Sequence, residues 1–299
     1  MTSIRWGIIG PGNIAHRFAD GLKESKSGEL VAIASTNEGR RKSFGDKYNI
    51  DSTLRFSSYD ELVESSDIDA IYISTPHTLH AEWTIKAAGR GKHVLCEKPG
   101  AVNLKEGKQV MQAVQEAGVF YMEGFMYRCH PQIKTLLKLI KEKQIGEIIS
   151  IRSSFGFDTG KTIPKSRLFN KELAGGAMLD VGSYPISFSR LVAGVASGKK
   201  FLNPVKLTGS ATIGETGVDE VAHAKFEFEN GIVAEASTAI REEMTNNAIL
   251  TGSKGTIEMN EPWTPGKEGK GYHSTIKINL NENTEIIDIK GQEHLFYFE

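Results

Sequence analysis

The first 124 residues repeat one rhythm, in which a short apolar run is followed by an amphipathic stretch and then by the next apolar run. Apolar runs that are continuous rather than alternating are typical of parallel strands buried on both faces. A repeated strand, helix, strand order with right-handed crossovers predicts a doubly wound parallel α/β sheet over residues 1–124. The expected strands are 4–10, 29–35, 68–74, 92–97 and 119–124.

One of the amphipathic stretches, residues 103–118, also carries signals for its two ends. Asn103 is a suitable N-cap, because its side chain can accept a hydrogen bond from a backbone N–H group of the first turn. Gly118 is a suitable stop, because glycine readily adopts the left-handed conformation that ends many helices. We therefore expect a helix between these two residues.

The rhythm changes after residue 124. Residues 130–146 indicate one helix, and the segments after it are rich in β-forming residues. A tight hairpin turn is expected at Asn230 and Gly231, because this pair accepts positive φ angles. The pattern predicts a second, α+β domain over residues 125–299, built on a large, mostly antiparallel open sheet, with 260–274 as a mobile loop. Its expected β segments are 147–157, 205–214, 218–228, 231–241, 247–259 and 274–298.

Charge and hydropathy exclude several classes of partner. The formal net charge of the 299 residues is −1, so we expect no nucleic-acid partner and no polybasic membrane contact. No apolar run approaches the roughly 20 residues that span a bilayer, and the start does not resemble a signal peptide, which predicts a cytoplasmic protein. Cys96 and Cys129 are far apart in the sequence, so neither a disulfide nor a metal site is expected.

A glycine-rich turn follows the first expected strand. Gly10, Gly12 and Ala15 form a GxGxxA pattern, in which the first glycine permits a tight turn and the second lets backbone approach a pyrophosphate. The N-terminus of the helix that follows faces the anion. The pattern predicts a dinucleotide-binding Rossmann site that includes Asn13 and Ile14. The alternatives are a plain turn and an S-adenosylmethionine site.

The end of the second expected strand bears on the choice between NAD and NADP. NAD enzymes usually carry an acid at this point, but here Ser35 opens a Ser-Thr-Asn sequence, and Glu38 is displaced. Arg40 and Arg41 follow one turn later and are suited to pair with a 2′-phosphate, so we predict NADP rather than NAD. The alternative is that both arginines form a solvated helix face.

The loop after the third expected strand, STPHTLH, should lie at the carboxyl edge of the sheet, against bound ligand. Thr75, Pro76, His77 and His80 are therefore assigned to the surroundings of the cofactor. His80 falls in the first turn of the next helix, where a packed or capping histidine is at least as good an interpretation as a catalytic one.

A charged pair followed by proline, Glu97, Lys98 and Pro99, ends the fourth expected strand. Charged residues are almost never fully buried without a partner, so we expect a ligand-facing strand end with Lys98 in the cleft. Glu97 would pair with Lys98 or anchor the loop, and both are included in the predicted cofactor site. An ammonium beside a reacting hydroxyl favours the alkoxide. The alternative is a surface salt bridge beside a turn proline, and a cis Lys98–Pro99 bond would suit such a turn.

Four motifs, GIIGPGNIA, STPHTLH, CEKP and GGAMLDVGSYP, occur in an order and spacing that resembles the glucose–fructose oxidoreductase/inositol dehydrogenase (Gfo/Idh/MocA) family. The resemblance covers nearly the whole chain. Many members have His where this chain has Tyr184, which, with EGFMYRCHPQ (123–132), resembles the branch of dimeric dihydrodiol dehydrogenase and NADP-dependent xylose dehydrogenase. Members of that branch usually continue past the last strand, so the resemblance implies that a C-terminal segment is missing.

The resemblance implies that Lys98 orients and polarises the substrate hydroxyl, with Asp180 and Tyr184 beside it. The chemistry is consistent, because a phenol has a pKa near 10 and a neighbouring ammonium lowers it. Asp180 and Tyr184 are four residues apart and would share a helical face. Pro185 predicts that the helix begins or kinks near Gly182. The alternative is a capping aspartate and an ordinary packed tyrosine.

Residues after the fifth expected strand are candidates for substrate contacts. Tyr127 and Arg128 are predicted to bind a polyhydroxylated substrate, together with Glu123 and His130. Arg128 is equally suited to act as a structural clamp between the domains. Trp263 is suited to stack on a sugar face, but a loop anchor is the better interpretation.

Together these features predict an NADP-preferring oxidoreductase that transfers a hydride between nicotinamide and a carbinol carbon of a sugar, polyol or trans-dihydrodiol. Tyr184 would be the general acid/base, Lys98 its electrostatic partner and Asp180 an orienting group. The alternative is a non-catalytic NADP-binding regulator on the same scaffold. An open sheet with a broad apolar face would pair with a copy of itself, so we also expect a homodimer or homotetramer through the C-terminal sheet.

Overall fold

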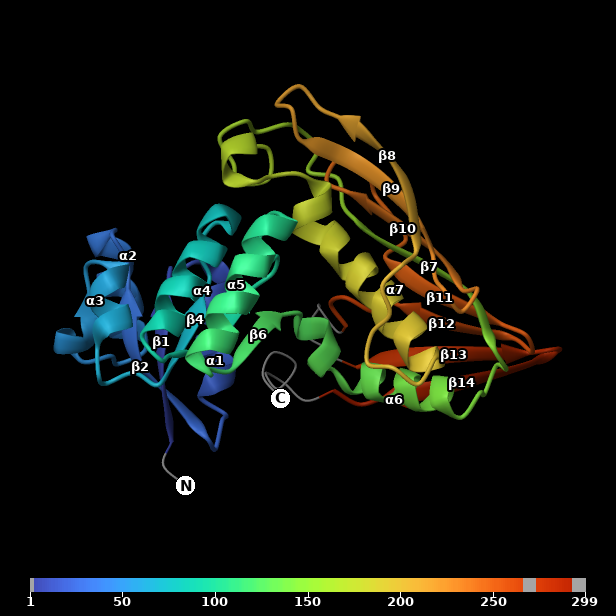
Figure 1. Ribbon diagram of the computed structural model, residues 1–299, viewed down its shortest axis with the longest axis horizontal. Coiled ribbons are helices and arrows are strands. Elements are labelled where there is room, and N and C mark those ends of the chain that lie inside the picture. The colour runs from blue at the N-terminus through green and yellow to red at the C-terminus, as the bar shows by residue number, and fades with distance from the viewer. Residues whose placement is uncertain (1–2, 266–272, 292–299) are drawn as a thin grey trace. The chain divides into compact units, whose positions relative to one another are not determined.

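The computed structural model describes residues 3–265 and 273–291 (Figure 1). The chain divides into two compact units, with the division between Phe125 and Met126. Residues 266–272 of the predicted mobile loop lie outside the described residues. In the part of the chain that is described, no helix is both long and apolar enough to cross a membrane.

The first unit is a parallel sheet of six strands in the order β3-β2-β1-β4-β5-β6, which confirms the predicted doubly wound sheet (Figure 1). The sequence did not predict β3, because two residues carry no periodicity. The strands are β1 (Ile4–Ile9), β2 (Gly28–Ala34), β3 (Arg55–Phe56), β4 (Ala70–Ile73), β5 (His93–Glu97) and β6 (Tyr121–Gly124). The helices are α1 (Asn13–Leu22), α2 (Glu38–Lys47), α3 (Tyr59–Glu64), α4 (His80–Gly89) and α5 (Leu104–Ala117), with short 3-10 helices η1 (Ser52–Leu54) and η2 (His77–Leu79).

Two apolar clusters hold helices against the two faces of this sheet. On one face, Phe18 of α1 stacks on Tyr72 of β4, with ring centroids 4.1 Å apart and planes 11° from parallel. On the other face, Trp83 of α4 packs with Leu62 of α3 and Ile71 of β4. All of these side chains are buried, and burial of each contributes roughly 1.5–3 kcal/mol to folding.

Helix α5 begins and ends where its sequence predicts. The Asn103 side chain accepts a hydrogen bond from the Glu106 backbone N–H, and Gly118 has the left-handed φ of 64° that closes the helix. Both signals are local, which explains why they can be recognised without knowledge of the tertiary fold.

The second unit contains a sheet of eight strands in the order β14-β13-β12-β11-β7-β10-β9-β8, in which only the β7–β10 pair is parallel. The mostly antiparallel sheet is therefore confirmed. Its strands are β7 (Ile148–Gly156), β8 (Lys206–Ile213), β9 (Asp219–Glu227), β10 (Val233–Ala239), β11 (Asn247–Gly252), β12 (Thr256–Asn260), β13 (Ser274–Leu280) and β14 (Asn283–Ile289). Its helices are η3 (Met126–Cys129), α6 (Pro131–Lys141), η4 (Lys171–Leu173), the π-helical turn η5 (Met178–Gly182) and α7 (Ser183–Ala196).

The turns of this sheet refine the predicted segments. Gly231 has a φ of 81°, as expected for the turn between β9 and β10. The predicted β segment 247–259 holds two strands, and so does the described part of 274–298. The turn that divides the second segment includes Asn281, whose positive φ of 53° the sequence analysis did not identify.

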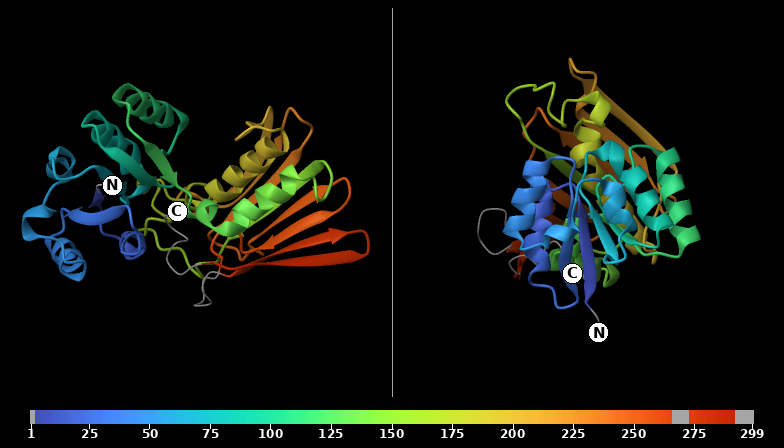
Figure 2. Two further views of the ribbon diagram at one scale, coloured as in Figure 1. Left: turned by 90° about the horizontal axis from the view of Figure 1, so that it is seen from below. Right: turned by 90° about the vertical axis from the view of Figure 1, so that its left-hand side faces the viewer.

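The two faces of the eight-stranded sheet differ in character. Helices α6 and α7 cover one face, as the left view of Figure 2 shows (green and yellow helices against orange and red strands). The other face carries a row of charged side chains across neighbouring strands. The expectation of a broad apolar open face is therefore wrong, because these strands alternate apolar residues toward the helices with polar residues on the open side. The row comprises Lys225, Glu235, Arg152, Glu258 and Lys277, with the apolar Ile249 between Arg152 and Glu258.

Candidate active site

The glycine-rich turn lies where the strand order reverses, between β1 and β4, which is where ligands bind in open α/β sheets. Gly10 has a φ of 89°, and a Cβ there would lie 3.1 Å from the Ser74 carbonyl oxygen. A Cβ on Gly12 would meet nothing within 4 Å, and among the described residues no side chain caps α1. The first N–H groups of α1, which include those of Asn13 and Ile14, are thus suited to a pyrophosphate.

The two arginines after β2 make different contacts. Arg41 donates from Nη1 to the Ser35 carbonyl oxygen at 2.6 Å, which fixes it to the strand end. Asn37 caps α2 by accepting from the Arg40 backbone N–H at 2.9 Å, and the Arg40 side chain is exposed. Arg41 therefore supports the backbone at the end of β2, and contact of Arg40 with the cofactor stays a prediction.

The loop after β4 is tied to the end of β5 by a buried histidine. His80 is only 1% exposed; its Nδ1 lies 2.8 Å from the Pro99 carbonyl oxygen and its Nε2 2.9 Å from that of Thr75. Burial lowers the pKa of His80, and the Lys98 charge lowers it further, while the two carbonyls oppose the shift. His77 is also buried, and Pro76 precedes η2. The direct contact of these residues with cofactor stays a prediction.

The Glu97-Lys98-Pro99 sequence lies at the end of β5, and the Lys98–Pro99 peptide bond is cis. The Tyr72 hydroxyl donates to Glu97 Oε1 at 2.6 Å. Burial raises the pKa of Glu97, and both the Tyr72 hydrogen bond and the Lys98 charge oppose this shift. Glu97 is therefore anchored in the sheet, which fixes the backbone from which Lys98 extends.

Asp180 lies in the π-helical turn that precedes α7, so the helix changes form at Gly182, as the position of Pro185 predicts. Its side chain is 5% exposed, and Arg167 Nη1 lies 2.6 Å from its Oδ1. The sequence analysis did not identify Arg167. A buried carboxylate requires a cation or several donors, but that requirement does not reveal which arginine supplies it.

Tyr184, at the start of α7, is buried in an aromatic cluster of the second unit. Its ring centroid lies 5.2 Å from that of Phe155, 5.7 Å from that of Tyr127 and 6.1 Å from that of Trp263. Edge-to-face contacts such as the first hold an aromatic ring in one orientation. The cluster therefore fixes the position of the Tyr184 phenol.

The other candidate substrate residues have structural contacts. Tyr127 is fully buried, and its hydroxyl donates a hydrogen bond to Ser187. His130 is the N-cap of α6. Trp263 is anchored by a 2.7 Å hydrogen bond from its indole N–H to the Ser154 carbonyl oxygen. The anchor interpretation of Trp263 is confirmed. Arg128 is exposed with its guanidinium 4.7 Å from the Phe201 ring centroid, so its roles as substrate ligand or interdomain clamp stay predictions.

Glu123 supports the turn after β5 rather than presenting a free carboxylate. Its Oε1 accepts a 2.7 Å hydrogen bond from the Gly100 backbone N–H. A Cβ on Gly100 would lie 2.2 Å from the Tyr121 hydroxyl, so any larger residue there would have to displace this side chain. Glu123 and Glu97 thus hold the two ends of the Lys98–Pro99 turn.

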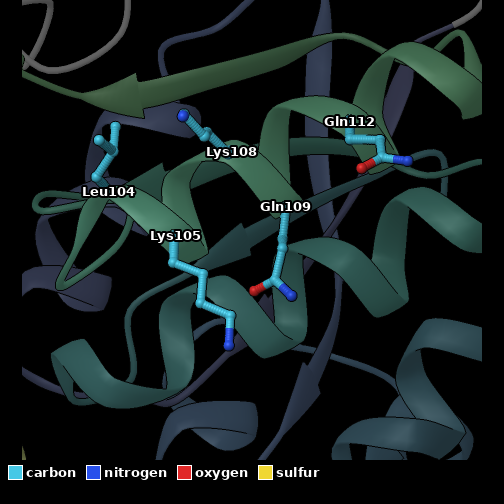
Figure 3. A pocket seen from close by; sticks show the side chains of 5 residues that line it. All are labelled: Leu104, Lys105, Lys108, Gln109 and Gln112. Carbon is cyan, nitrogen blue, oxygen red and sulfur yellow. The ribbon is translucent and has the colours of Figure 1, made fainter.

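A surface groove of about 620 Å³ lies along α5 (Figure 3). It is lined by Leu104, Lys105, Lys108, Gln109 and Gln112, none of which is a predicted site residue. Among residues 3–265 and 273–291, no group of three or more His, Cys, Asp or Glu side chains is arranged to hold a metal ion.

Two family models match the chain. One, described as "Oxidoreductase family, NAD-binding Rossmann fold", matches residues 4–125, and the other, "GFO/IDH/MocA C-terminal domain", matches residues 133–258. Trans-1,2-dihydrobenzene-1,2-diol dehydrogenase of Xenopus laevis is 33% identical over 291 residues, 94% of this chain and 85% of the relative. dTDP-3,4-didehydro-2,6-dideoxy-alpha-D-glucose 3-reductase of Actinomadura kijaniata is 33% identical over 289 residues, 94% of this chain and 81% of the relative.

A solved structure extends the match to the fold. The 3-ketoreductase KijD10 from Actinomadura kijaniata, in complex with NADP and TDP-benzene, has a TM-score of 0.85 and 29% identity, with 99% of this chain and 87% of that chain covered. The motifs quoted above, both family models and these relatives agree. The chain therefore belongs to the GFO/IDH/MocA family of NAD(P)-dependent oxidoreductases.

Proposed function

We propose that this oxidoreductase uses NADP and transfers a hydride between nicotinamide and a carbinol carbon of a sugar, a polyol or a trans-dihydrodiol. The observation that carries the proposal is the end of β5, where Lys98 follows the anchored Glu97 at the same sheet edge as the glycine-rich turn. The relatives named for a dihydrodiol and for a dTDP-linked sugar, and the solved ketoreductase with NADP, support it.

The residues of the first unit fit the cofactor. Gly10, Gly12 and the first turn of α1 would hold the pyrophosphate, and Arg40 would pair with the 2′-phosphate. Ser35, Thr75 and their neighbours would line the rest of the cofactor site. When bound, NADP supplies the hydride acceptor or donor of the reaction.

The protein's own groups would handle the proton and the charge. Tyr184 would exchange a proton with the carbinol oxygen as general acid/base, and Lys98 would stabilise negative charge on that oxygen and on the phenol. Asp180 would orient the reacting groups. The aromatic cluster around Tyr184 and the anchored Glu97 favour these roles, because a proton-transfer group must be held in one position.

The test follows the absorbance of reduced nicotinamide with NADP⁺ and NAD⁺ against aldoses, inositols, polyols and trans-dihydrodiols. We expect turnover with one of these classes and a preference for NADP⁺. Binding of NADPH without oxidation of any carbinol would instead favour a non-catalytic regulator. Failure to bind either nicotinamide would contradict the cofactor assignment.

Arg40→Ala is expected to raise the KM for NADP⁺ by about 10–100-fold and to leave the KM for NAD⁺ nearly unchanged. The reason is the loss of a charge-assisted hydrogen bond to the 2′-phosphate, a bond of roughly 1.5–3 kcal/mol. Arg41→Ala is the matched control, because Arg41 supports the Ser35 backbone and its loss should affect both cofactors alike. If Arg40→Ala changed the KM for NADP⁺ no more than the KM for NAD⁺, Arg40 would belong to a solvated helix face.

We also propose a homodimer through the open face of the eight-stranded sheet, as a dimer or within a tetramer. A two-fold axis that runs parallel to β11 and lies between two copies would bring complementary charges together. Arg152 would then face Glu258 of the second copy, and Ile249 would face Ile249 of the second copy. Glu235 would likewise face Lys277 of the second copy. All four charged side chains are at least a third exposed and accessible to a partner.

Arg152→Glu is expected to weaken dimerisation by at least about 100-fold, because like charges across an interface cost several kcal/mol. Adding Glu258→Arg to the same chain should restore the dimer, since the facing charges are then opposite again. Lys206→Glu is the control, because four strands lie on the β8 side of β11 and only three on the other, so in this dimer no strand of the second copy would face β8. Light scattering and sedimentation at micromolar concentration measure the mass. A wild-type monomer, or a double variant weaker than the single one, would contradict the interface.

A further inference from the structure

Asp180 has a specific partner outside its own helix. Its side chain is 5% exposed, whereas that of Arg167, the cation on its Oδ1 at 2.6 Å, is 54% exposed. The guanidinium therefore covers a buried carboxylate from the solvent side. Such a carboxylate loses favourable solvation on burial and depends on its partner for compensation.

The glycine pair of the GGAMLD sequence brings Arg167 to this position. A Cβ on Gly175 would lie 2.5 Å from the Leu168 carbonyl oxygen and 2.7 Å from that of Arg167, closer than real Cβ atoms come. Gly176 has a φ of 112° and donates its N–H to the Leu168 carbonyl oxygen at 2.9 Å. Only glycine therefore allows the Arg167–Leu168 backbone to pass directly against the turn that leads into Asp180.

Both sides of the contact are anchored. Phe169, two residues after Arg167, is buried in a small apolar cluster with Val218 and Ile240. On the other side, Asp219 Oδ2 accepts a 2.6 Å hydrogen bond from the Met178 backbone N–H at the start of the π-helical turn. The distance between Arg167 and Asp180 is thus set by the fold around them and not by a flexible surface loop.

We infer that Arg167 is a positioning residue, which holds the Asp180 carboxylate in one orientation for the reaction. The inference deepens the proposed function and rests on it, because Asp180 is given its role there. The inference also explains the spacing of the GGAMLD sequence. Its two glycines let the Arg167 backbone pass close by, and Asp180, at the end of the sequence, accepts the hydrogen bond from Arg167.

The test is chemical rescue. Arg167→Ala should lower kcat by about 10–100-fold, the range expected when a reacting group is displaced by about 1 Å, with a smaller change in the KM for NADP⁺. Because Arg167 is half exposed, millimolar guanidinium chloride should restore part of the lost kcat, whereas equal sodium chloride or urea should not. Arg167→Lys should retain more activity than Arg167→Ala. Arg241→Ala is the control, because it breaks an exposed pair with Asp158 at the start of the same loop.

A second measurement does not need turnover. Thermal unfolding of Arg167→Ala, Asp180→Asn and the double variant should show that the second substitution has much less effect once the first is present, because paired residues are coupled. A wild-type chain without turnover would contradict the proposed function alone, and this coupling would still decide whether Arg167 holds Asp180. Additive losses of Tm, or a kcat that guanidinium and lysine both fail to restore, would overturn the inference.

Discussion

Lys98→Met is expected to lower kcat by about 10²–10³-fold, while the Kd for NADPH changes by less than about tenfold. Methionine preserves much of the apolar stem of lysine and removes only its charge. The backbone around Lys98 should remain in place, because Tyr72 and Glu123 hold the residues on either side of the turn. Stopped-flow turnover and the fluorescence of bound NADPH measure the two quantities separately.

Lys105→Met is the matched control for this prediction. Lys105 belongs to the same unit and is exposed on α5, so the substitution makes the same change of charge outside the predicted site. We expect kcat within a factor of about two of the wild-type value. Full turnover of Lys98→Met with a carbinol substrate would remove Lys98 from the reaction, even if Lys105→Met behaved as expected.

Tyr184→Phe is expected to lower kcat by about 10²–10⁴-fold, the usual contribution of a general acid/base. Phenylalanine keeps the ring and its contacts with Phe155, Tyr127 and Trp263, so the aromatic cluster should remain packed around position 184. A large loss of kcat at nearly constant stability would therefore identify the hydroxyl as the group that matters. The measurements are steady-state kinetics and denaturant unfolding of the same preparation.

Tyr127→Phe provides the comparison within the same cluster. It removes the buried hydrogen bond to Ser187 and should lower the free energy of unfolding by about 1 kcal/mol. Its kcat should stay far closer to the wild-type value than that of Tyr184→Phe. If the two variants lost equal activity at equal stability, the special role of Tyr184 would be contradicted.

The sequence predicts the parts of the fold that depend on local pattern. Continuous apolar runs gave the long strands of the first unit, and Asn103 and Gly118 gave both ends of α5. The patterns did not indicate the two residues of β3, where the signal was short, and they did not place the turn between β13 and β14 within a segment predicted only as rich in β structure. The prediction of an apolar open face was also wrong, because polar residues alternate with apolar ones along each of these strands.

The candidate site was predictable as far as it depends on strand ends. The rule that ligands bind at the carboxyl edge of a parallel sheet selected Gly12 and Lys98 as candidates, and both follow closely after strands of the parallel sheet. Burial was predicted for His80 only as one of two interpretations, and it was not predicted for Tyr127, whose hydroxyl partner Ser187 is 60 residues away in the sequence. Arg167 was missed because only the folded backbone reveals that Gly175 leaves room for it.

The outermost strand β8 has a consequence for behaviour at high concentration. It pairs only with β9 among the described strands, and all eight of its residues are exposed, so its outer backbone groups are a template for another strand. The pairing irregularity between Thr212 and Ile213, and the charge of Lys206 at the opposite end, are features that discourage such addition. Concentrated solutions of the folded chain should therefore contain closed particles of finite size rather than fibres.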